Sequence, residues 1–234
     1  MFPNQQVYSG TYSFAPSGGE IIIGAFQRVQ IRPTEITVSH LQTAVLELNL
    51  LQAKFGSQQP NLWDVDLQSL PLTRGQATYS IPAETVMITN AYVRTGTGTS
   101  IVDRMIFPIS QTEYAAISNK ATQGSPTQFW FNRLISPTIT FYLTPDGNGP
   151  YTVNYYRVRT LQDALATNGY NVEVPSRFMD AIIAGLAHRL ARVYAPQLED
   201  KRKMDADEAW TVAATQDTEN VNLYIAPSIS GYYR

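Results

Sequence analysis

Apolar residues recur at three- and four-residue steps in two segments near the start of the chain, which is the pattern of an amphipathic helix. The first segment, residues 18–30, ends before Pro33. Thr34 is the expected N-cap of the second helix, with Glu35 in its first turn. Residues 18–56 are therefore predicted to form a helical hairpin. The apolar face of its second helix is made by Leu41, Ala44, Val45, Leu48, Leu51 and Phe55.

Between residues 61 and 159 the period changes to two, which predicts β-strands. Loops are expected at Thr95–Thr99 and at Pro145–Pro150, the second as a hairpin turn before Tyr151. One short helix, Gln111–Asn119, is expected to interrupt the strands. We predict a small antiparallel sheet or sandwich. The strands are expected at Ala77–Ile81, Val86–Arg94, Ile101–Pro108, Gln128–Leu134, Thr138–Leu143 and Tyr151–Arg159.

The helical period returns in residues 175–218. Pro175 stands near the start of a third helix, and Pro196 fits the first turn of a fourth, where a missing N–H costs little. The fourth helix is highly charged and has a narrower apolar face. The stripe of the third helix is made by Phe178, Met179, Ile182, Ile183, Leu186, Leu190 and Val193.

Each helix pair has an apolar face without a partner nearby in the sequence, so the two pairs are predicted to pack together as a four-helix bundle. The fold class is α+β. The bundle domain is discontinuous, with residues 18–60 and 160–219, and the antiparallel, sandwich-like β domain of residues 61–159 is inserted between its halves. Extended arms are expected at residues 1–17 and 220–234.

Composition excludes several kinds of protein. The net charge is −2, which argues against a dedicated nucleic-acid binder. The chain has no Cys, so disulfides and Cys-based zinc sites are excluded. No signal peptide is visible, and the apolar runs are too short for a membrane span, so we expect no membrane. Only 15% of residues are charged and 14 are Tyr, which suits either a surface covered by other subunits or simply a β-rich chain.

The sequence offers no arrangement typical of an enzyme or a metal centre. His40 and His188 both fall inside predicted helices, where packed or surface positions are expected. Asp64 and Asp66 would share one face of a strand and could hold a hard cation, but such a pair is more typically solvated. The Thr95–Ser100 loop lacks the Lys of a phosphate-binding loop. We therefore expect no catalytic, cofactor-binding or metal residues.

The fourth helix carries three successive cations, Lys201, Arg202 and Lys203. Acidic residues surround them, which favours a solvated or salt-bridged face. Contact with a neighbouring subunit or with DNA is the alternative.

The terminal arms are rich in aromatic and aliphatic residues, which are an aggregation liability unless something covers them. A partner protein or the arm's own domain could do so, and the first is favoured. In the C-terminal arm these residues are Leu223, Tyr224, Ile225, Ile229, Tyr232 and Tyr233.

The organisation as a helical hairpin, an inserted β domain and a second helix pair resembles a known family. The most similar stretches are Val174–Ala187 running on through Arg192–Tyr194, and Leu143–Gly147 followed by Tyr151–Arg157. They resemble the head-to-tail adaptors (tail tubular or head-completion proteins) of short-tailed double-stranded-DNA bacteriophages. No catalytic motif anchors the resemblance, which rests on architecture.

The resemblance implies a non-enzymatic virion protein without cofactors, assembled in the host cytoplasm and placed at the head–tail interface. It implies a homo-oligomeric ring, commonly a dodecamer, that joins the portal protein to the tail tube or nozzle protein. DNA would pass through the ring with weak, non-specific contact. It also implies that the C-terminal arm, through the residues given above, binds the portal, while the β-domain loops face the tail.

Two other functions stay open at this level. In a virion or surface module that recognises carbohydrate, Trp63, Trp130 and Tyr92 would be the stacking platforms, although Trp130 could equally be partly core. In a hydrolase, Asp64 and Asp66 would be the acid–base pair, but the sequence provides no partner that would orient a base.

Overall fold

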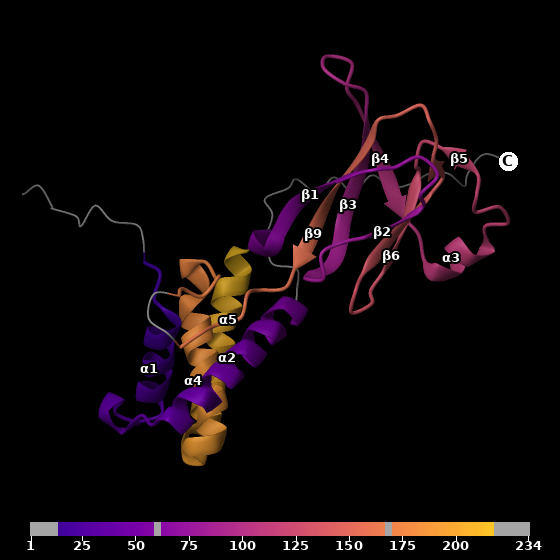
Figure 1. Cartoon of the computed structure of the whole chain (residues 1–234). Coiled ribbons are helices and arrows are strands. Elements are labelled where there is room, and N and C mark those ends of the chain that lie inside the picture. The colour runs from indigo at the N-terminus through magenta and orange to yellow at the C-terminus, as the bar shows by residue number, and fades with distance from the viewer. Residues whose placement is uncertain (1–13, 59–61, 167–169, 218–234) are drawn as a thin grey trace, which may run out of the picture.

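The computed structural model of the chain describes residues 14–58, 62–166 and 170–217, whose helices and strands form two parts that lie end to end (Figure 1). The helical part is made by α1 (Gly18–Arg28), α2 (Val38–Gln58), α4 (Met179–Tyr194) and α5 (Glu199–Gln216). The β part holds the short helix α3 (Gln111–Ala116) and the strands. These are β1 (Val65–Pro71), β2 (Thr78–Ser80), β3 (Thr85–Thr95), β4 (Val102–Pro108), β5 (Gln123–Gly124), β6 (Gln128–Asn132), β7 (Thr138–Tyr142), β8 (Thr144–Pro145) and β9 (Tyr151–Arg159).

Helix α1 begins where the sequence predicts, because Ser17 and Glu20 cap it reciprocally. The Glu20 N–H donates to Ser17 Oγ at 3.3 Å, and the Ser17 N–H donates to Glu20 Oε2 at 2.8 Å. This capping box satisfies two N–H groups that would otherwise have no partner in the helix. The Ser17 N–H and the Ser17 hydroxyl both donate to the Glu20 carboxylate, and these two hydrogen bonds lower the pKa of Glu20.

Helix α2 begins later than predicted, and Thr34 is not its cap. Residues Pro33–Glu35 form a separate 3₁₀ turn, and Ile36 after them is extended. The cap is Thr37, whose Oγ1 accepts from the His40 N–H at 3.3 Å while its own N–H donates to His40 Nδ1 at 3.2 Å. His40 thus takes the place that Glu has in a capping box. Its ring also packs against Phe26 and Tyr194, so it is a packed residue, as expected.

Helix α4 is the central element of the helical part, because it contacts α1, α2 and α5. Its Ile182, Leu186 and Leu190 are fully buried, in one cluster with Phe26 of α1 and Leu48 of α2. The N-terminal helices therefore pack on the C-terminal ones, whereas the arrangement as a four-helix bundle stays a prediction. Helix α2 approaches α4 closely at one glycine.

That glycine is Gly185, and it faces Leu51 of α2. A Cβ atom at Gly185 would lie 3.0 Å from Leu51 Cδ2, tighter than ordinary van der Waals contact. The missing side chain therefore brings the two helices together. The apolar faces of α1 and α2 both pack against α4.

The sheet is mixed, so the all-antiparallel prediction is wrong. The described strands form one seven-stranded sheet with the order β1-β9-β3-β4-β6-β7-β2, together with a two-stranded ribbon of β5 and β8. Strands β4 and β6 pair in parallel at Phe107–Pro108 and Gln128–Phe129. The intervening chain, which includes α3, is long enough for the crossover that parallel neighbours require. A sandwich would need two large sheets face to face, whereas this sheet is continuous and curled (Figure 1).

Pairing within the sheet corrects two further expectations. The Pro145–Pro150 loop does not close a hairpin, since β9 pairs with β1 and β3, whereas β7 pairs with β6 and β2. Strand β1 had no counterpart among the expected strands; it pairs with β9 from Val65 opposite Val158 to Pro71 opposite Thr152. By contrast, the predicted loop after Thr95 does join an antiparallel pair, β3 and β4.

Two glycines of α1 offer a matched test of this packing. A Cβ atom at Gly18 would lie 2.2 Å from the backbone oxygen of Leu165, whereas a Cβ atom at Gly24 would lie 3.6 Å from Ile183 Cγ2, an ordinary contact. We expect Gly18→Ala to destabilise the fold by about 2 kcal/mol or more, because backbone must move. Gly24→Ala should be neutral or stabilising, by up to about 1 kcal/mol, because Ala favours helix. Urea unfolding followed by circular dichroism measures both; equal stabilities would contradict the close approach at Gly18.

Candidate functional site

The predicted portal-binding residues of the C-terminal arm lie outside the described residues, so their role stays a prediction. The same holds for residues 1–13 of the N-terminal arm. The end of that arm is described, and Ser17 forms an isolated β-bridge with Asn171. The Gly18 N–H also donates to the Tyr170 backbone oxygen at 3.1 Å. The chain before α1 and the chain between β9 and α4 therefore meet beside α1.

The three successive cations of α5 do not form one basic patch. Lys203 lines a pocket against α2 and α4, whereas Arg202 lies in a groove on the α1 side beside Arg28. Arg202 is paired with Asp205 at 3.0 Å. Lys201 is exposed to solvent. Successive helix residues point in different directions, so these side chains cannot act together on one phosphate backbone.

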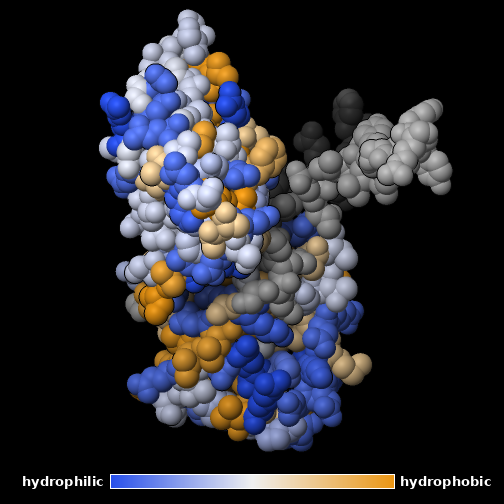
Figure 2. Space-filling model, turned by 90° about the vertical axis from the view of Figure 1, so that its right-hand side faces the viewer, coloured by the Kyte–Doolittle hydropathy of each residue, from blue (hydrophilic) through white to orange (hydrophobic). Residues whose placement is uncertain are grey.

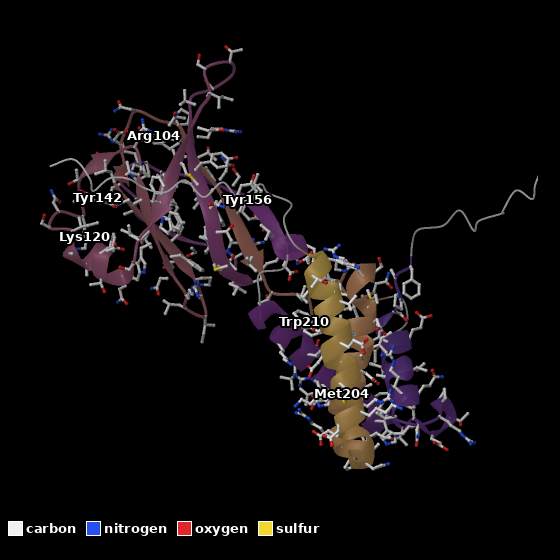
Figure 3. The ribbon with its side chains drawn as sticks, turned by 180° about the vertical axis from the view of Figure 1, so that it is seen from behind. Arg104, Lys120, Tyr142, Tyr156, Met204 and Trp210 are labelled. Atoms are coloured by element: carbon white, nitrogen blue, oxygen red, sulfur yellow. The ribbon has the colours of Figure 1, made fainter. Side chains whose placement is uncertain are left out.

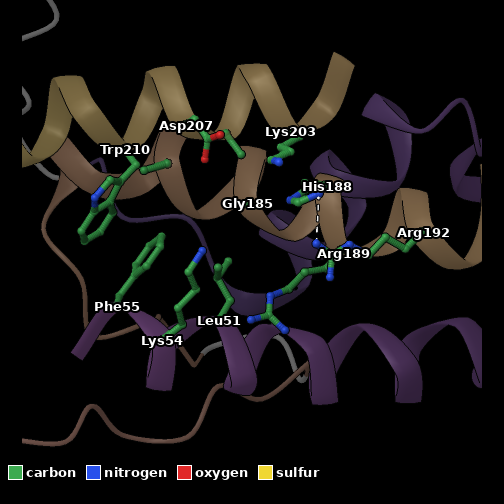
Figure 4. A pocket seen from close by; sticks show the side chains of 12 residues that line it. Leu51, Lys54, Phe55, Gly185, His188, Arg189, Arg192, Lys203, Asp207 and Trp210 are labelled. Atoms are coloured by element: carbon green, nitrogen blue, oxygen red, sulfur yellow. Dashed lines mark hydrogen bonds between the residues drawn. The ribbon is translucent and has the colours of Figure 1, made fainter. Parts of the chain in front are cut away.

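A pocket lies between α2, α4 and α5, with a volume of about 320 Å³ (Figure 4). Its apolar lining comes from Leu51 and Phe55 of α2, Gly185 of α4 and Trp210 of α5. The Phe55 and Trp210 rings lie 4.3 Å apart. Because Gly185 has no side chain, α2 and α4 meet behind the pocket, and the aromatic pair closes one end.

The rest of the pocket lining is rich in cations: Lys54, Arg189, Arg192 and Lys203, against the single carboxylate of Asp207. Figure 4 shows Lys54 extending from α2, and Lys203 and Asp207 from α5, toward the same space.

Both arginines of the pocket have carboxylate partners at its rim. Arg189 Nη1 donates to Glu47 at 2.9 Å, and Arg192 Nε donates to Glu199 at 3.1 Å. No described carboxylate lies within ion-pair distance of either lysine, and that is the unusual feature of the site.

His188 of α4 lines this pocket. Burial, together with the nearby Arg192 guanidinium, lowers its pKa below the ordinary value. Arg192 Nη2 lies 3.4 Å from His188 Nε2, and Glu199 lies 4.0 Å from the same atom. His188 and His40 occupy different places, one in the pocket and one at the start of α2. Within the described residues neither has an Asp or Glu that orients it toward a Ser or Thr nucleophile.

The predicted Asp64 and Asp66 pair is divided between two roles. Asp64 lies buried in a 3₁₀ turn before β1, whereas Asp66 on β1 binds Arg157 of β9 through two hydrogen bonds of 2.7 and 3.1 Å. Arg157 is almost fully buried and also donates to Glu84 at 3.1 Å. Asp66 therefore neutralises a buried guanidinium. Among the described residues no group of three or more His, Asp or Glu side chains could hold a metal ion.

The three aromatic residues of the carbohydrate hypothesis lie in separate places. Trp63 packs against the helical core beside Phe178, with ring centroids 5.8 Å apart. Trp130 of β6 stacks on Tyr114 of α3 at 5.4 Å. Tyr92 lies on β3, next to Arg94. They do not form a shared platform, so the structure adds no support for a sugar site.

Apolar side chains are exposed on both parts of the molecule. Leu46 and Leu50 lie one turn apart on α2 and are 60% and 47% exposed, and Met204 on α5 is 73% exposed (Figure 3). On the β part, Ile135, in the turn between β6 and β7, is 97% exposed. Figure 2 shows apolar surface gathered on the helical part among strongly hydrophilic residues. None of the described helices is long and apolar enough to cross a membrane.

Comparison with known families identifies the class. A family model described as SU10 adaptor protein matches residues 19–223, which span the helical part and the β part. The chain is thus a bacteriophage adaptor protein, a structural component of the virion that interacts with other phage structural proteins. It belongs to the SU10 adaptor protein family. The comparison with curated proteins finds no match. The predicted adaptor class is confirmed; the narrower placement in short-tailed phages stays a prediction.

The buried Arg157 cluster generates a pH-dependent prediction. Hydrogen bonds from Arg157 are the main cause that lowers the pKa of Asp66, so ionised Asp66 stabilises the folded state. That contribution is fully present above the unfolded pKa of about 3.9 and is lost as the pH falls through the lower, folded pKa. We expect Asp66→Asn to lower the free energy of unfolding at pH 7 by about 1–2 kcal/mol, less than for a fully buried pair because the carboxylate is partly exposed.

The matched control is Asp103, which makes a two-pronged hydrogen bond with Arg94 at 2.8 Å, with both side chains well exposed. Asp103→Asn should cost less than about 1 kcal/mol. Chemical unfolding at pH 7 and near pH 3 measures both. The Asp66→Asn deficit should shrink at the lower pH; a deficit that is the same at both values would contradict the role given to the ionised carboxylate.

Proposed function

We propose that the chain forms a closed ring that joins the portal to the tail tube or nozzle of a short-tailed bacteriophage and surrounds part of the DNA passage. The observation that carries this proposal is the adaptor family match over residues 19–223. The match includes the helices that flank the β part as well as the β part itself. Both parts of the molecule therefore contribute to the proposed function, with α1, α2, α4 and α5 acting together as one bundle.

A ring built from head-to-tail contacts needs two different surfaces on each subunit. The helical part offers apolar surface on two different helices, Leu46 and Leu50 of α2 and Met204 of α5. Only 15% of the residues are charged, so little charge has to be desolvated when such surfaces are covered. These features support a ring in which α2 of one subunit faces the next copy.

The two ends of the molecule suit two different partners. We assign portal binding to the C-terminal arm, residues 220–234, through its aromatic and aliphatic side chains. We assign tail contact to the loops of the β part, where Leu134 and Ile135 are 60% and 97% exposed. DNA contact is weak in this proposal, because the net charge is −2 and Arg202 of α5 already has a carboxylate partner.

The arm assignment is tested by removing residues 220–234 from the full chain. We expect the truncated protein to keep its helical circular dichroism and its unfolding midpoint, and to lose binding to the portal protein of the same phage. Light scattering coupled to gel filtration measures binding, and negative-stain microscopy shows whether rings form. Unchanged affinity for the portal would contradict the arm's role while leaving ring formation to be judged from the images.

The ring surface is tested by the double variant Leu46→Gln and Leu50→Gln. Both side chains are already exposed, so we expect the subunit's stability to change by less than about 0.5 kcal/mol. The subunit concentration needed for ring assembly should rise at least tenfold, because an apolar contact between copies is lost. The matched control is Leu134→Gln with Ile135→Gln, which are also apolar and at least as exposed but lie at the other end. If both double variants assemble like the parent, α2 is not the ring surface.

A further inference from the structure

The pocket between α2, α4 and α5 combines an apolar wall with cations that have no counter-charge. Lys54 enters from α2 and Lys203 from α5, and within the described residues neither is paired with a carboxylate. One wall is the Phe55 and Trp210 ring pair. Two helices that are remote in sequence thus present one ammonium group each to the same pocket.

The charge count leaves room for one anion. Four cations line the pocket, and the carboxylates that face or adjoin them are those of Asp207, Glu47 and Glu199. Burial and the nearby Arg192 lower the pKa of His188, which favours its neutral form. One positive charge therefore remains uncompensated, next to an apolar surface.

We propose that this pocket binds the carboxylate of an acidic residue in a protein segment from another virion subunit, with Lys54 and Lys203 as its charge partners and the Phe55 and Trp210 rings against a neighbouring apolar side chain. The proposed preference for a carboxylate beside an apolar side chain depends only on the residues of the pocket. Only the identity of the presenting protein rests on the proposed adaptor function.

A carboxylate fits this site better than a nucleic-acid phosphate. A volume of about 320 Å³ is at the small end of ligand pockets, and it suits one or two side chains. DNA binding needs an extended surface with an uncompensated positive field. Here Glu47 and Glu199 at the rim would face the neighbouring phosphates of a DNA strand. Aromatic walls beside a single charge are instead typical of protein contacts, where aromatic and charged anchors combine.

His188 gives a direct readout, because the chain has only two His residues and His40 is not among the residues that line the pocket. The groups that act on His188 electrostatically are Arg192, Glu199, Asp207 and Lys203, and Lys54 and Arg189 line the same space. An anion placed among these cations adds negative potential, so it should raise the pKa of His188. The His40 resonance serves as the internal reference in the same sample.

The experiment titrates the full-length chain with the peptide acetyl-phenylalanyl-glutamyl-amide and follows both imidazole resonances by NMR. We expect a saturable shift at His188, a raised His188 pKa in the peptide complex, and no change at His40. The matched ligand is the same peptide with glutamine in place of glutamate, and inorganic phosphate is the third probe. We expect the glutamine peptide and phosphate each to bind at least about tenfold more weakly than the glutamate peptide. The glutamine peptide loses a charge-assisted hydrogen bond, and phosphate loses the apolar contact.

Three variants of the protein sharpen the test. Lys203→Gln and Lys54→Gln should each weaken peptide binding about tenfold, whereas Lys201→Gln, on the same helix but outside the pocket lining, should leave it unchanged. Asp207→Asn removes the competing carboxylate, so it should strengthen binding. An increase in one variant and a decrease in two others cannot all come from general damage to the fold.

Several outcomes would overturn the proposal. They are the absence of a saturable His188 shift, equal binding of the glutamine peptide, tighter binding of phosphate than of the peptide, and an equal loss in Lys201→Gln and Lys203→Gln. Each concerns the pocket in the isolated chain, so each is distinguishable from a failure of ring assembly or portal binding. If rings form but His188 does not respond, the pocket assignment fails and the adaptor proposal stands.

Discussion

The burial of α4 is the constraint on which the helical part depends. This helix contacts α1, α2 and α5, and Ile182, Leu186 and Leu190 are fully buried among them. Neither helix pair could bury its apolar stripe alone, so the two ends of the chain must meet before either is stable. The β part is consequently held between two segments that have to close on each other, and its position follows from that closure.

A second constraint lies where the two parts join. Arg157 on β9 is buried between Asp66 of β1 and Glu84, and Asn49 of α2 binds the backbone of Ala164, accepting from its N–H at 2.7 Å. The strands that lead into and out of the sheet are therefore tied to each other, and the chain leaving the sheet is tied to α2. The pocket and the exposed faces of α2 and α5 lie on the helical side of this junction. The buried core of the helical part holds these helices in place.

Periodicity predicted the long helices and most strands, because side-chain pattern reports burial directly. It missed β1, because Leu67 is exposed while the polar Asp66 and Gln68 on either side of it are partly buried, which reverses the usual alternation. It placed the α2 cap at Thr34, because the residue three positions after Thr37 is His40 and not the Glu or Gln that marks a capping box. Periodicity does not predict which strands pair. The Pro145–Pro150 loop has the composition of a hairpin turn, yet β9 pairs with β1 and β3 and not with β7. The pocket could not be predicted either, since Lys54 and Lys203 are 149 positions apart and neither has a motif around it.

The order of the strands has a mechanical consequence. The start of β1, Val65, lies opposite the end of β9, Val158, so both chain connections to the helices leave the sheet from the same end. Tension between the two parts would pull β1 and β9 together in one direction, and it would be resisted as shear along the ladder between β9 and β3, which runs from Thr85 to Thr95. Hydrogen bonds in such a ladder bear the load simultaneously instead of opening one by one, an arrangement suited to a joint that must hold under strain.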